Sequence, residues 1–274
     1  MTRENAFDVT AKLIAEIKKL KCSVFMDKSL QNVFGDVDCI TYCEADSCVE
    51  AFDMVISVGG DGSFINSAKL ATVYSKPVVC INAGKLAYLA CLEADELSLL
   101  ANVVSGNYIT EKRMMLDVSV VDKIGEILYH STCINDAVVS RSGNIRIMKL
   151  SAFCNGTPLI EYMADGAIVA TPTGSTAYSL SAGGPIVEPC VESILLTPVC
   201  SHSVFSRSIV LGGNSVLELT HDNSGEAILS CDGQPAVNVP EGARVVVKRS
   251  SQNVEFVKIK SDTFIEILNK KISG

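Results

Sequence analysis

The hydrophobic pattern of this chain changes near residue 110, and that change limits the possible folds more than any other feature. Before it, apolar residues recur at helical spacing in some stretches, such as residues 4–20, and form short continuous runs in others, such as residues 54–58. Strands that alternate with helices indicate a parallel sheet with helical crossovers. We therefore predict an α/β domain over residues 1–110.

Apolar spacing, glycine and proline predict the elements of this domain. Pro77 interrupts the pattern just before the strand predicted at 78–81, and Gly106 ends the helix predicted at 95–104. Helices are expected over residues 4–20, from about Phe64 to Ala71 and over 95–104, and strands over residues 22–26, 54–58 and 78–81.

From Met114 onward, helix signals nearly vanish and turn residues divide the chain into short apolar runs. This pattern is typical of an all-β domain, so we predict a sandwich-like domain over residues 111–250. A tail follows over residues 251–274, with a strand-like part at 254–259 and then a short helical part. Strands of the second domain are expected over residues 116–121, 126–133, 137–140, 145–153, 167–171, 215–220, 227–230 and 244–248.

Composition and charge exclude several classes of protein. The chain has 274 residues, and its 23 basic and 31 acidic residues give a formal charge of 23 − 31 = −8. Nonspecific nucleic-acid binding needs a basic face, so we expect no nucleic-acid partner. No stretch reaches the ~20 apolar residues of a membrane helix, and residues 1–25 have no signal-peptide core. We expect a cytoplasmic protein with no membrane partner.

The eleven cysteines are scattered along the chain. The tightest group, Cys39, Cys43 and Cys48, does not have the spacing of a zinc site. A free thiol inside an apolar run behaves as a small hydrophobic side chain. We expect reduced, structural cysteines in a reducing compartment.

The first motif that carries chemistry is Gly59–Ser63, which follows a predicted buried strand and opens a predicted helix. Its glycines let backbone amides approach a ligand, and the amides of the helix N-terminus suit a phosphate. Asp61 would serve as the base for an attacking hydroxyl, or act through a divalent metal. The alternative role for Asp61 is that of a helix cap.

The second motif runs from Ala164 to Pro185 and is dense in hydroxyl side chains and glycine. Short hydroxyls can orient a ribose or a base edge, and Tyr178 could stack on a ring. A solvated turn is the weaker alternative, because such a turn needs neither an aromatic residue nor the glycine pair before Pro185.

The third motif, Asn135-Asp136, lies between two predicted strands. An amide beside a carboxylate can read a donor–acceptor pair on a sugar or base. Taken alone, the pair is more typical of a β-turn.

Together these residues resemble the NAD kinase family, which phosphorylates NAD to NADP. Gly59–Gly62 resembles the glycine-rich loop of that family, which lipid kinases and phosphofructokinases share, whereas Asp165–Pro185 matches its longest and most specific signature. Further segments resemble the family in order along the chain: Asn82–Leu89, Asn135-Asp136, His202–Leu211 and Asp232–Gln234.

The resemblance implies an N-terminal α/β domain, a C-terminal β-sandwich, and a tail that returns to the first domain. NAD would bind in the crevice between the domains, and ATP or polyphosphate would donate the phosphoryl group. Asp61 would be the catalytic base, and Mg²⁺ or another divalent cation would neutralise the phosphates; its protein ligands stay unassigned. The expected binding residues are Gly59, Gly60, Asp61, Gly62, Asn135, Asp136, Arg146, Asp165, Thr173, Thr176, Ala177, Tyr178, Ser181 and Gln234.

In the family some of these contacts, including the one from Asp165, come from a neighbouring subunit. A homo-oligomer, a dimer or tetramer, is therefore implied. The sequence also departs from the family pattern. Ala87 and Tyr88 replace glycine and phenylalanine, Ser208 replaces proline, and Asn66 stands where many members have a basic residue. The strand that usually precedes the first helix of the family is not recognisable.

Three alternative functions remain. A lipid kinase would share the glycine-rich loop but would also need a basic membrane-facing cluster, which the sequence lacks. A sugar-phosphate kinase would share the loop without this second domain. A noncatalytic NADP-binding sensor would have lost the base, whereas Asp61 is present.

Overall fold

The computed structural model describes residues 3–84, 87–143, 147–202, 204–221 and 227–272. The chain divides into two compact units, which are described separately below. Unit 1 contains residues 1–112 together with 254–274, and unit 2 contains residues 113–253. Two long strands, β6 (Ile109–Val121) and β17 (Arg244–Lys258), pair with each other and belong partly to each unit.

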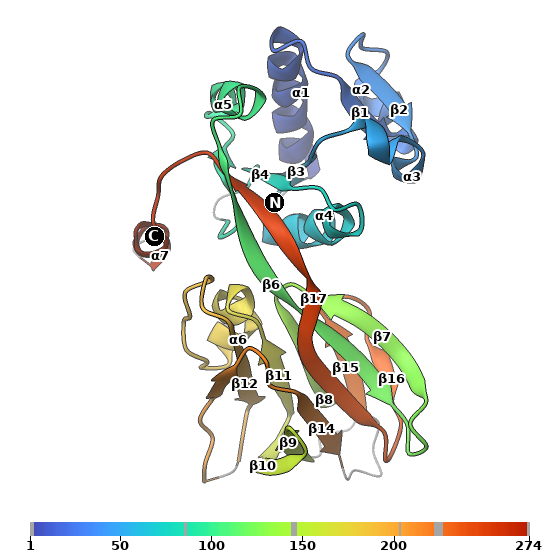
Figure 1. Cartoon of the computed structure of the whole chain (residues 1–274), viewed down its shortest axis with the longest axis vertical. Helices are drawn as coiled ribbons and strands as arrows, with labels where there is room; N and C mark the ends of the chain where they lie inside the picture. Colours follow the sequence, from blue (N-terminus) through green and yellow to red (C-terminus); the bar gives the residue numbers. More distant parts are fainter. Residues whose placement is uncertain (1–2, 85–86, 144–146, 203, 222–226, 273–274) are drawn as a thin grey trace. The chain divides into compact units, whose positions relative to one another are not determined.

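Unit 1 is built on parallel strands (Figure 1). Strand β3 (Val55–Gly59) pairs with β4 (Val78–Asn82), and β4 also pairs with β5 (Leu92–Glu93) and with β17. The remaining elements of the unit are α1 (Arg3–Lys19), β1 (Val24–Asp27), α2 (Gln31–Phe34), β2 (Ile40–Cys43), α3 (Ala45–Cys48), α4 (Asp61–Val73), α5 (Leu100–Val104), α7 (Phe264–Ile272) and the 3-10 turns η1 (Lys28–Leu30), η2 (Val49–Ala51) and η3 (Leu97–Leu99). Strands β1 and β2 form a separate parallel pair.

One face of α1 explains its place in unit 1. Val9, Leu13 and Ile17 recur every four residues, so they share a face of the helix. They are buried in one cluster with Val79 of β4 and with Val257 of β17. The core of unit 1 is therefore built from residues near both ends of the sequence.

Unit 2 is a sandwich of two antiparallel sheets. One sheet has the order β13-β12-β11-β8-β15-β16, and the other contains β10, β9, β14 and β17, with β6 beside β17 and β7 beside β6. The elements not yet bounded are β7 (Ile127–Cys133), β8 (Asp136–Arg141), β9 (Met148–Cys154), β10 (Thr157–Ala164), β11 (Gly166–Ala170), η4 (Thr173–Thr176), α6 (Tyr178–Ser181), β12 (Ser193–Val199), β13 (Ile209–Gly212), β14 (Leu217–His221), β15 (Ala227–Cys231) and β16 (Val237–Val239).

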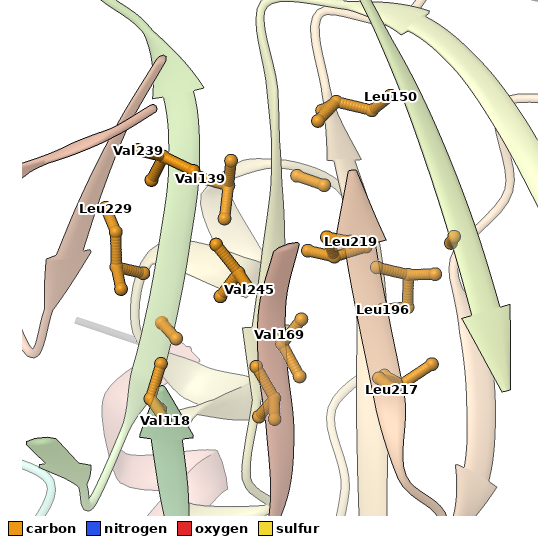
Figure 2. Packing of buried hydrophobic residues seen from close by; sticks show 14 of the residues in the cluster. Val118, Val139, Leu150, Val169, Leu196, Leu217, Leu219, Leu229, Val239 and Val245 are labelled. Atoms are coloured by element: carbon orange, nitrogen blue, oxygen red, sulfur yellow. The ribbon is translucent and has the colours of Figure 1, made fainter. Parts of the chain in front are cut away.

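The core of unit 2 lies between the two sheets (Figure 2). Val139 and Val169 point inward from one sheet, and Leu219 and Val245 point inward from the other. Strand β11 is buried on both faces: its other face carries Ile168 and packs under a second apolar cluster that includes Ala182 and Val187 of the segment after α6. The part of the hydroxyl-rich motif that follows β11 therefore packs back onto this strand.

The predicted fold class, an α/β domain with a parallel sheet followed by an all-β sandwich, is confirmed. Some elements differ. The two predicted strands at 244–248 and 254–259 are a single strand, β17, and the predicted helix over 95–104 divides into η3 and α5. The strands that sequence reasoning missed are β2, β5, β10, β12, β13 and β16. Pro158 and Pro198 lie inside two of these strands, where proline normally argues against a strand.

Two other expectations concern the cysteines and the membrane. All eleven cysteines lie in the described residues, and none of them forms a disulfide. Burial raises the pKa of Cys80 and raises that of Cys91 to about 11, so both thiols are protonated at neutral pH and pack as apolar side chains. In the described part of the chain, no helix is both long and apolar enough to cross a membrane.

Candidate active site

The glycine-rich loop joins β3 to α4 in unit 1. Gly60 is the N-cap residue of α4, and its carbonyl accepts hydrogen bonds from the backbone amides of Ser63 and Phe64, at 2.9 and 3.0 Å. Phe64 is fully buried, whereas Gly62 and Ser63 are exposed. The helix is thus anchored by its apolar face while its first turn faces solvent, as anion binding at a helix N-terminus requires.

Two glycines of this loop have different structural roles. A Cβ atom on Gly59 would lie 2.7 Å from the Ser63 side chain, so the fold itself requires glycine there. A Cβ atom on Gly62 would meet nothing within 4 Å. Packing within the chain therefore does not explain Gly62, which leaves open space beside the backbone.

Asp61 is the first residue of α4, and its carboxylate bonds to a distant segment. Oδ2 accepts a hydrogen bond from the amide of Tyr88 at 2.9 Å, and Oδ1 accepts one from the amide of Leu89 at 3.0 Å. The alternative interpretation of Asp61 as a helix cap is wrong, since Gly60 occupies the cap position. A carboxylate has about four acceptor positions, so these two bonds leave acceptor capacity for a proton.

The segment that contacts Asp61 is fixed at its start by Asn82. The Asn82 side chain is buried, donates to Glu93 Oε2 at 2.8 Å and accepts from the amide of Gly84 at 2.8 Å. Asn5 also donates to the carbonyl of Ala83. The segment from Asn82 to Leu89 is therefore held at its start by the Asn82 side chain and at its end by Asp61.

Asn135 lies in the bend between β7 and β8 of unit 2, and Asp136 begins β8; the two residues are called the Asn135-Asp136 bend below. Its backbone contacts the start of the hydroxyl-rich motif: the amide of Thr171 donates to the carbonyl of Asn135 at 2.8 Å, and the Thr171 hydroxyl donates to the carbonyl of Ile134 at 2.6 Å. A Cβ atom on Gly174 would lie 2.1 Å from the Asn135 carbonyl oxygen. The structure therefore brings the second and third motifs together, and it requires glycine at their closest approach.

The hydroxyl-rich motif forms short helical turns, η4 and α6, rather than an open loop. Ser175 and Ser179 are fully buried and bond within the fold: Ser175 Oγ contacts the carbonyl of Pro172, and Ser179 Oγ contacts Thr197 Oγ1. The residues predicted to bind NAD differ in exposure. Thr173 is buried, Thr176 and Ala177 are half-buried, and Tyr178 and Ser181 are exposed.

The glycine pair that follows α6 has a structural explanation. Gly183 has a left-handed backbone (φ 87°), and the amide of Gly184 donates back to the carbonyl of Ser179 at 2.8 Å. This is the Schellman arrangement that ends helices. In the sequence this glycine pair favours a binding function over a turn. In the structure it terminates α6.

Asp165 precedes β11, whereas Thr171 and the hydroxyl side chains of the same motif follow it. Asp165 forms an ion pair with Arg141, whose Nε donates to Asp165 Oδ1 at 2.8 Å. The hydrogen bond from Arg141 lowers the pKa of Asp165, and the same bond raises the pKa of Arg141. In the strand pair β8–β11, Gly166 faces Ser140 while Ala170 faces Asp136. The five residues of β11, about 17 Å of strand, therefore separate Asp165 from Asp136 within one chain.

Two predicted binding residues remain. Gln234 is exposed in the turn after β15, where its carbonyl accepts a hydrogen bond from Ser230 Oγ at 2.7 Å. Arg146 lies outside the described residues. Among the described residues, no group of three or more His, Cys, Asp or Glu side chains could hold a metal ion.

Sequence reasoning missed the residue that holds the Asn135-Asp136 bend. The carboxylate of Asp232 accepts hydrogen bonds from the amides of Ile134, Asn135 and Asp136. In the sequence, Asp232 is part of the family-like segment Asp232–Gln234 and of a pair typical of a turn, and neither signal reveals a partner almost 100 residues away.

The order and content of these motifs agree with comparisons to known proteins. The sequence model of the ATP-NAD kinase N-terminal domain matches residues 4–108, and that of the ATP-NAD kinase C-terminal domain matches residues 134–259. The chain belongs to the ATP-NAD kinase family. The family predicted from the motifs is therefore confirmed.

Individual members of the ATP-NAD kinase family match most of the chain. The NAD kinase of Symbiobacterium thermophilum is 42% identical over 224 residues, covering 81% of this chain and 79% of that protein. The NAD kinase of Caldanaerobacter subterraneus subsp. tengcongensis is 39% identical over 224 residues, covering 81% and 78%. The NAD kinase of Acetivibrio thermocellus is 33% identical over 273 residues, covering 98% and 93%.

Solved structures of the ATP-NAD kinase family share the fold. Yeast NADH kinase complexed with NADH superposes with a TM-score of 0.87 at 24% identity, over 98% of this chain and 84% of that one. An NAD kinase from Archaeoglobus fulgidus in complex with ATP gives a TM-score of 0.69 at 22% identity, over 92% and 98%.

Proposed function

We propose that this chain is an NAD kinase, a phosphotransferase that moves the terminal phosphoryl group of ATP to the adenosine-ribose 2′-hydroxyl of NAD. The products are NADP and ADP. The observation that carries the proposal is the match of both ATP-NAD kinase domain models, which together include Asp61, Asn135 and Asp136. The second domain distinguishes this function from that of a sugar-phosphate kinase with the same loop.

At the donor end, the glycine-rich loop would hold the triphosphate. The exposed first turn of α4 supplies amides that favour anionic oxygens, and Gly62 leaves room for them. Asp61 would take the proton from the 2′-hydroxyl as that oxygen bonds to the terminal phosphorus and the bridging phosphoanhydride bond breaks. Its bonds to Tyr88 and Leu89 orient the carboxylate for this role.

At the acceptor end, Asn135 and Asp136 would form hydrogen bonds to NAD. The NAD-binding site would be lined by the half-buried and exposed residues of the hydroxyl-rich motif, which are Thr176, Ala177, Tyr178 and Ser181. The buried Thr173 and the exposed Gln234 would complete this set. This reaction needs little covalent chemistry from the protein, so firm placement of one hydroxyl is the main task of these residues.

A divalent cation, Mg²⁺ in the first instance, would enter with the nucleotide. Mg²⁺ sites of this kind commonly combine substrate phosphates with one or two carboxylates, and Asp61 is the carboxylate that the glycine-rich loop offers. The ion would supply charge neutralisation at the phosphates. Eleven cysteines without a disulfide are compatible with a reducing cytoplasm, which we propose as the location.

The test is an assay of purified protein with NAD, Mg²⁺ and either ATP or polyphosphate, followed by enzymatic measurement of NADP. We expect NADP with ATP. Replacing NAD by NADH, and separately by diacylglycerol, measures acceptor choice and distinguishes a lipid kinase. Folded protein that makes no NADP with either donor would refute the proposal.

We also propose a homo-oligomer whose site is shared between subunits. Asp165 belongs to the family signature, yet about 17 Å of strand separate it from Asp136 in one chain. A site that uses both aspartates is more easily built from two chains than from one.

Mixed subunits test this sharing. Asp61→Asn and Asp165→Ala proteins should each be nearly inactive. After joint dissociation and reassembly the mixture should regain part of the activity, because some sites would draw their intact aspartates from different chains. No recovery, in mixtures that exchange subunits by mass spectrometry, would contradict a shared site.

A further inference from the structure

We propose that Asp232 is a positioning residue for NAD recognition, which sets the conformation of the Asn135-Asp136 bend. The proposal rests on the proposed function for the role of that bend. It adds a residue that contacts the backbone of the bend rather than the dinucleotide, and it gives that residue a measurable effect on one substrate and not on the other.

The carboxylate of Asp232 binds three consecutive backbone amides. Oδ2 accepts from Ile134 at 2.8 Å, while Oδ1 accepts from Asn135 at 2.8 Å and from Asp136 at 3.0 Å. Hydrogen bonds to a charged acceptor are stronger than neutral ones. Three donors directed at one carboxylate fix the backbone of all three residues.

The backbone of Asp232 strengthens the same contact. Its amide donates to the carbonyl of Asp136 at 2.9 Å, directly beyond the last paired residues of β15 and β8, Cys231 and Ala137. Asp232 has a left-handed conformation (φ 49°), which aspartate and asparagine tolerate better than most residues. The turn thus bends the chain back so that the carboxylate meets the amides.

The carbonyl side of the bend is held by Thr171. Its hydroxyl donates to the carbonyl of Ile134 at 2.6 Å and accepts from the amide of Gly174 at 3.0 Å, while its amide donates to the carbonyl of Asn135. Asp232 therefore binds the amides of the bend, and Thr171 binds its carbonyls.

Fixing the backbone in this way prepares the two side chains that would read NAD. A site whose supporting residues are already ordered loses less conformational entropy when ligand binds. Asp232 would thus favour NAD binding without touching the nucleotide, and it would leave ATP binding at the glycine-rich loop unaffected.

The informative variant is Asp232→Asn. Asparagine tolerates the left-handed backbone and has nearly the same volume, but its NH₂ group would face a backbone donor in place of one carboxylate oxygen. Losing a charge-assisted bond of this kind corresponds to about tenfold to a hundredfold. We expect the KM for NAD to rise by that factor, with the KM for ATP changing less than about twofold.

Asp122→Asn is the matched control. Asp122 also accepts hydrogen bonds from two amides, of Ile124 and Glu126, but in an exposed hairpin of the same unit. It should leave both KM values unchanged. If Asp232→Asn behaves like this control, or raises both KM values equally, Asp232 only supports the fold and the proposal is wrong.

Amide hydrogen exchange gives a second test, and its first part needs only the wild-type protein. The amides of Ile134, Asn135 and Asp136 should exchange slowly, and Asp232→Asn should speed their exchange while leaving β11 protected. Fast exchange of these amides in the wild type would overturn the proposal. Wild-type protein with protected amides but no NADP formation would instead refute the proposed function.

Discussion

Asp61 in unit 1 and Asp232 in unit 2 both bind backbone amides, but they do so on different scales. Asp61 reaches two amides 27 and 28 residues away, one on each carboxylate oxygen. Asp232 reaches three amides 96 to 98 residues away, and its backbone joins the same contact. The first carboxylate keeps acceptor capacity beside an exposed loop, whereas the second is engaged in holding a bend. This difference fits the two proposed roles, which are chemistry for Asp61 and placement of the bend for Asp232.

The largest expected effect tests the chemical half of this comparison. In Asp61→Asn the side chain keeps its shape but cannot take a proton, and its NH₂ group would face one of the two amides that Asp61 binds. Turnover should therefore fall by roughly 10²-fold or more. The KM for NAD should change little. Steady-state kinetics with ATP and Mg²⁺ measure both values.

Asp53→Asn is the control for this change. Asp53 is exposed, precedes β3 in the same unit and loses the same charge. It should retain normal turnover. Near-normal turnover of Asp61→Asn would show that Asp61 only binds the amides of Tyr88 and Leu89, and the contrast with Asp232 would disappear.

An intermediate effect is expected at the closest approach of the two motifs in unit 2. In Gly174→Ala the new methyl group would lie 2.1 Å from the Asn135 carbonyl oxygen, so the backbone must shift. Such overpacking typically costs about 1–3 kcal/mol. We expect a fall of several degrees in Tm by calorimetry, together with a higher KM for NAD.

Gly212→Ala provides the comparison for that variant, since a Cβ atom on Gly212 meets nothing within 4 Å. It should leave both Tm and the KM for NAD unchanged. Equal behaviour of the two variants would mean that the bend tolerates displacement, and its precise placement would then not govern NAD binding.

The smallest expected effect is on stability, and it concerns the ion pair between Arg141 and Asp165. Because the hydrogen bond from Arg141 lowers the pKa of Asp165 in the folded state, the pair adds stability at pH values above the ordinary aspartate pKa of about 4. This stability is lost as the pH falls from there through the lowered pKa of the folded state. Solvent screens a pair that is this exposed, so the contribution should be small.

Arg141→Gln tests the direction in which the stability from this ion pair changes with pH. Its Tm should lie slightly below that of the wild type at pH 7, and the difference should shrink toward pH 3. Arg244→Gln, which removes a longer 3.3 Å pair with Glu218, serves as the control. A difference that grows in acid would contradict the assigned direction of the pKa.

The contrast between the two aspartates also shows which features could be predicted from the sequence and which could not. Gly59–Ser63 is contiguous, so its strand–turn–helix context and its role could be predicted from neighbouring residues. The Asn135-Asp136 bend depends on Asp232 and Thr171, whose contacts form only after the strands of unit 2 have paired. No local spacing encodes such contacts.

Local rules failed in two further places. No helix is predicted in the hydroxyl-rich motif, but its buried Ser175 and Ser179 bond to groups within the fold and stabilise short helical turns. In β10, Pro158 lies beside a break in the pairing register between Pro158 and Ile160, and this break explains how a strand with a proline near its start still pairs with β9.

The passage of β17 from unit 2 into unit 1 has a consequence for the order of folding during synthesis. Residues 1–112 leave the ribosome first, yet their core contains Val257, and Lys260 binds Glu96 at 2.7 Å. Unit 2 is one uninterrupted stretch, so it can fold while the tail is still being translated. Unit 1, although most of it is translated before unit 2, is therefore the last to be completed, and until then part of its apolar core stays uncovered and open to aggregation or to chaperone binding.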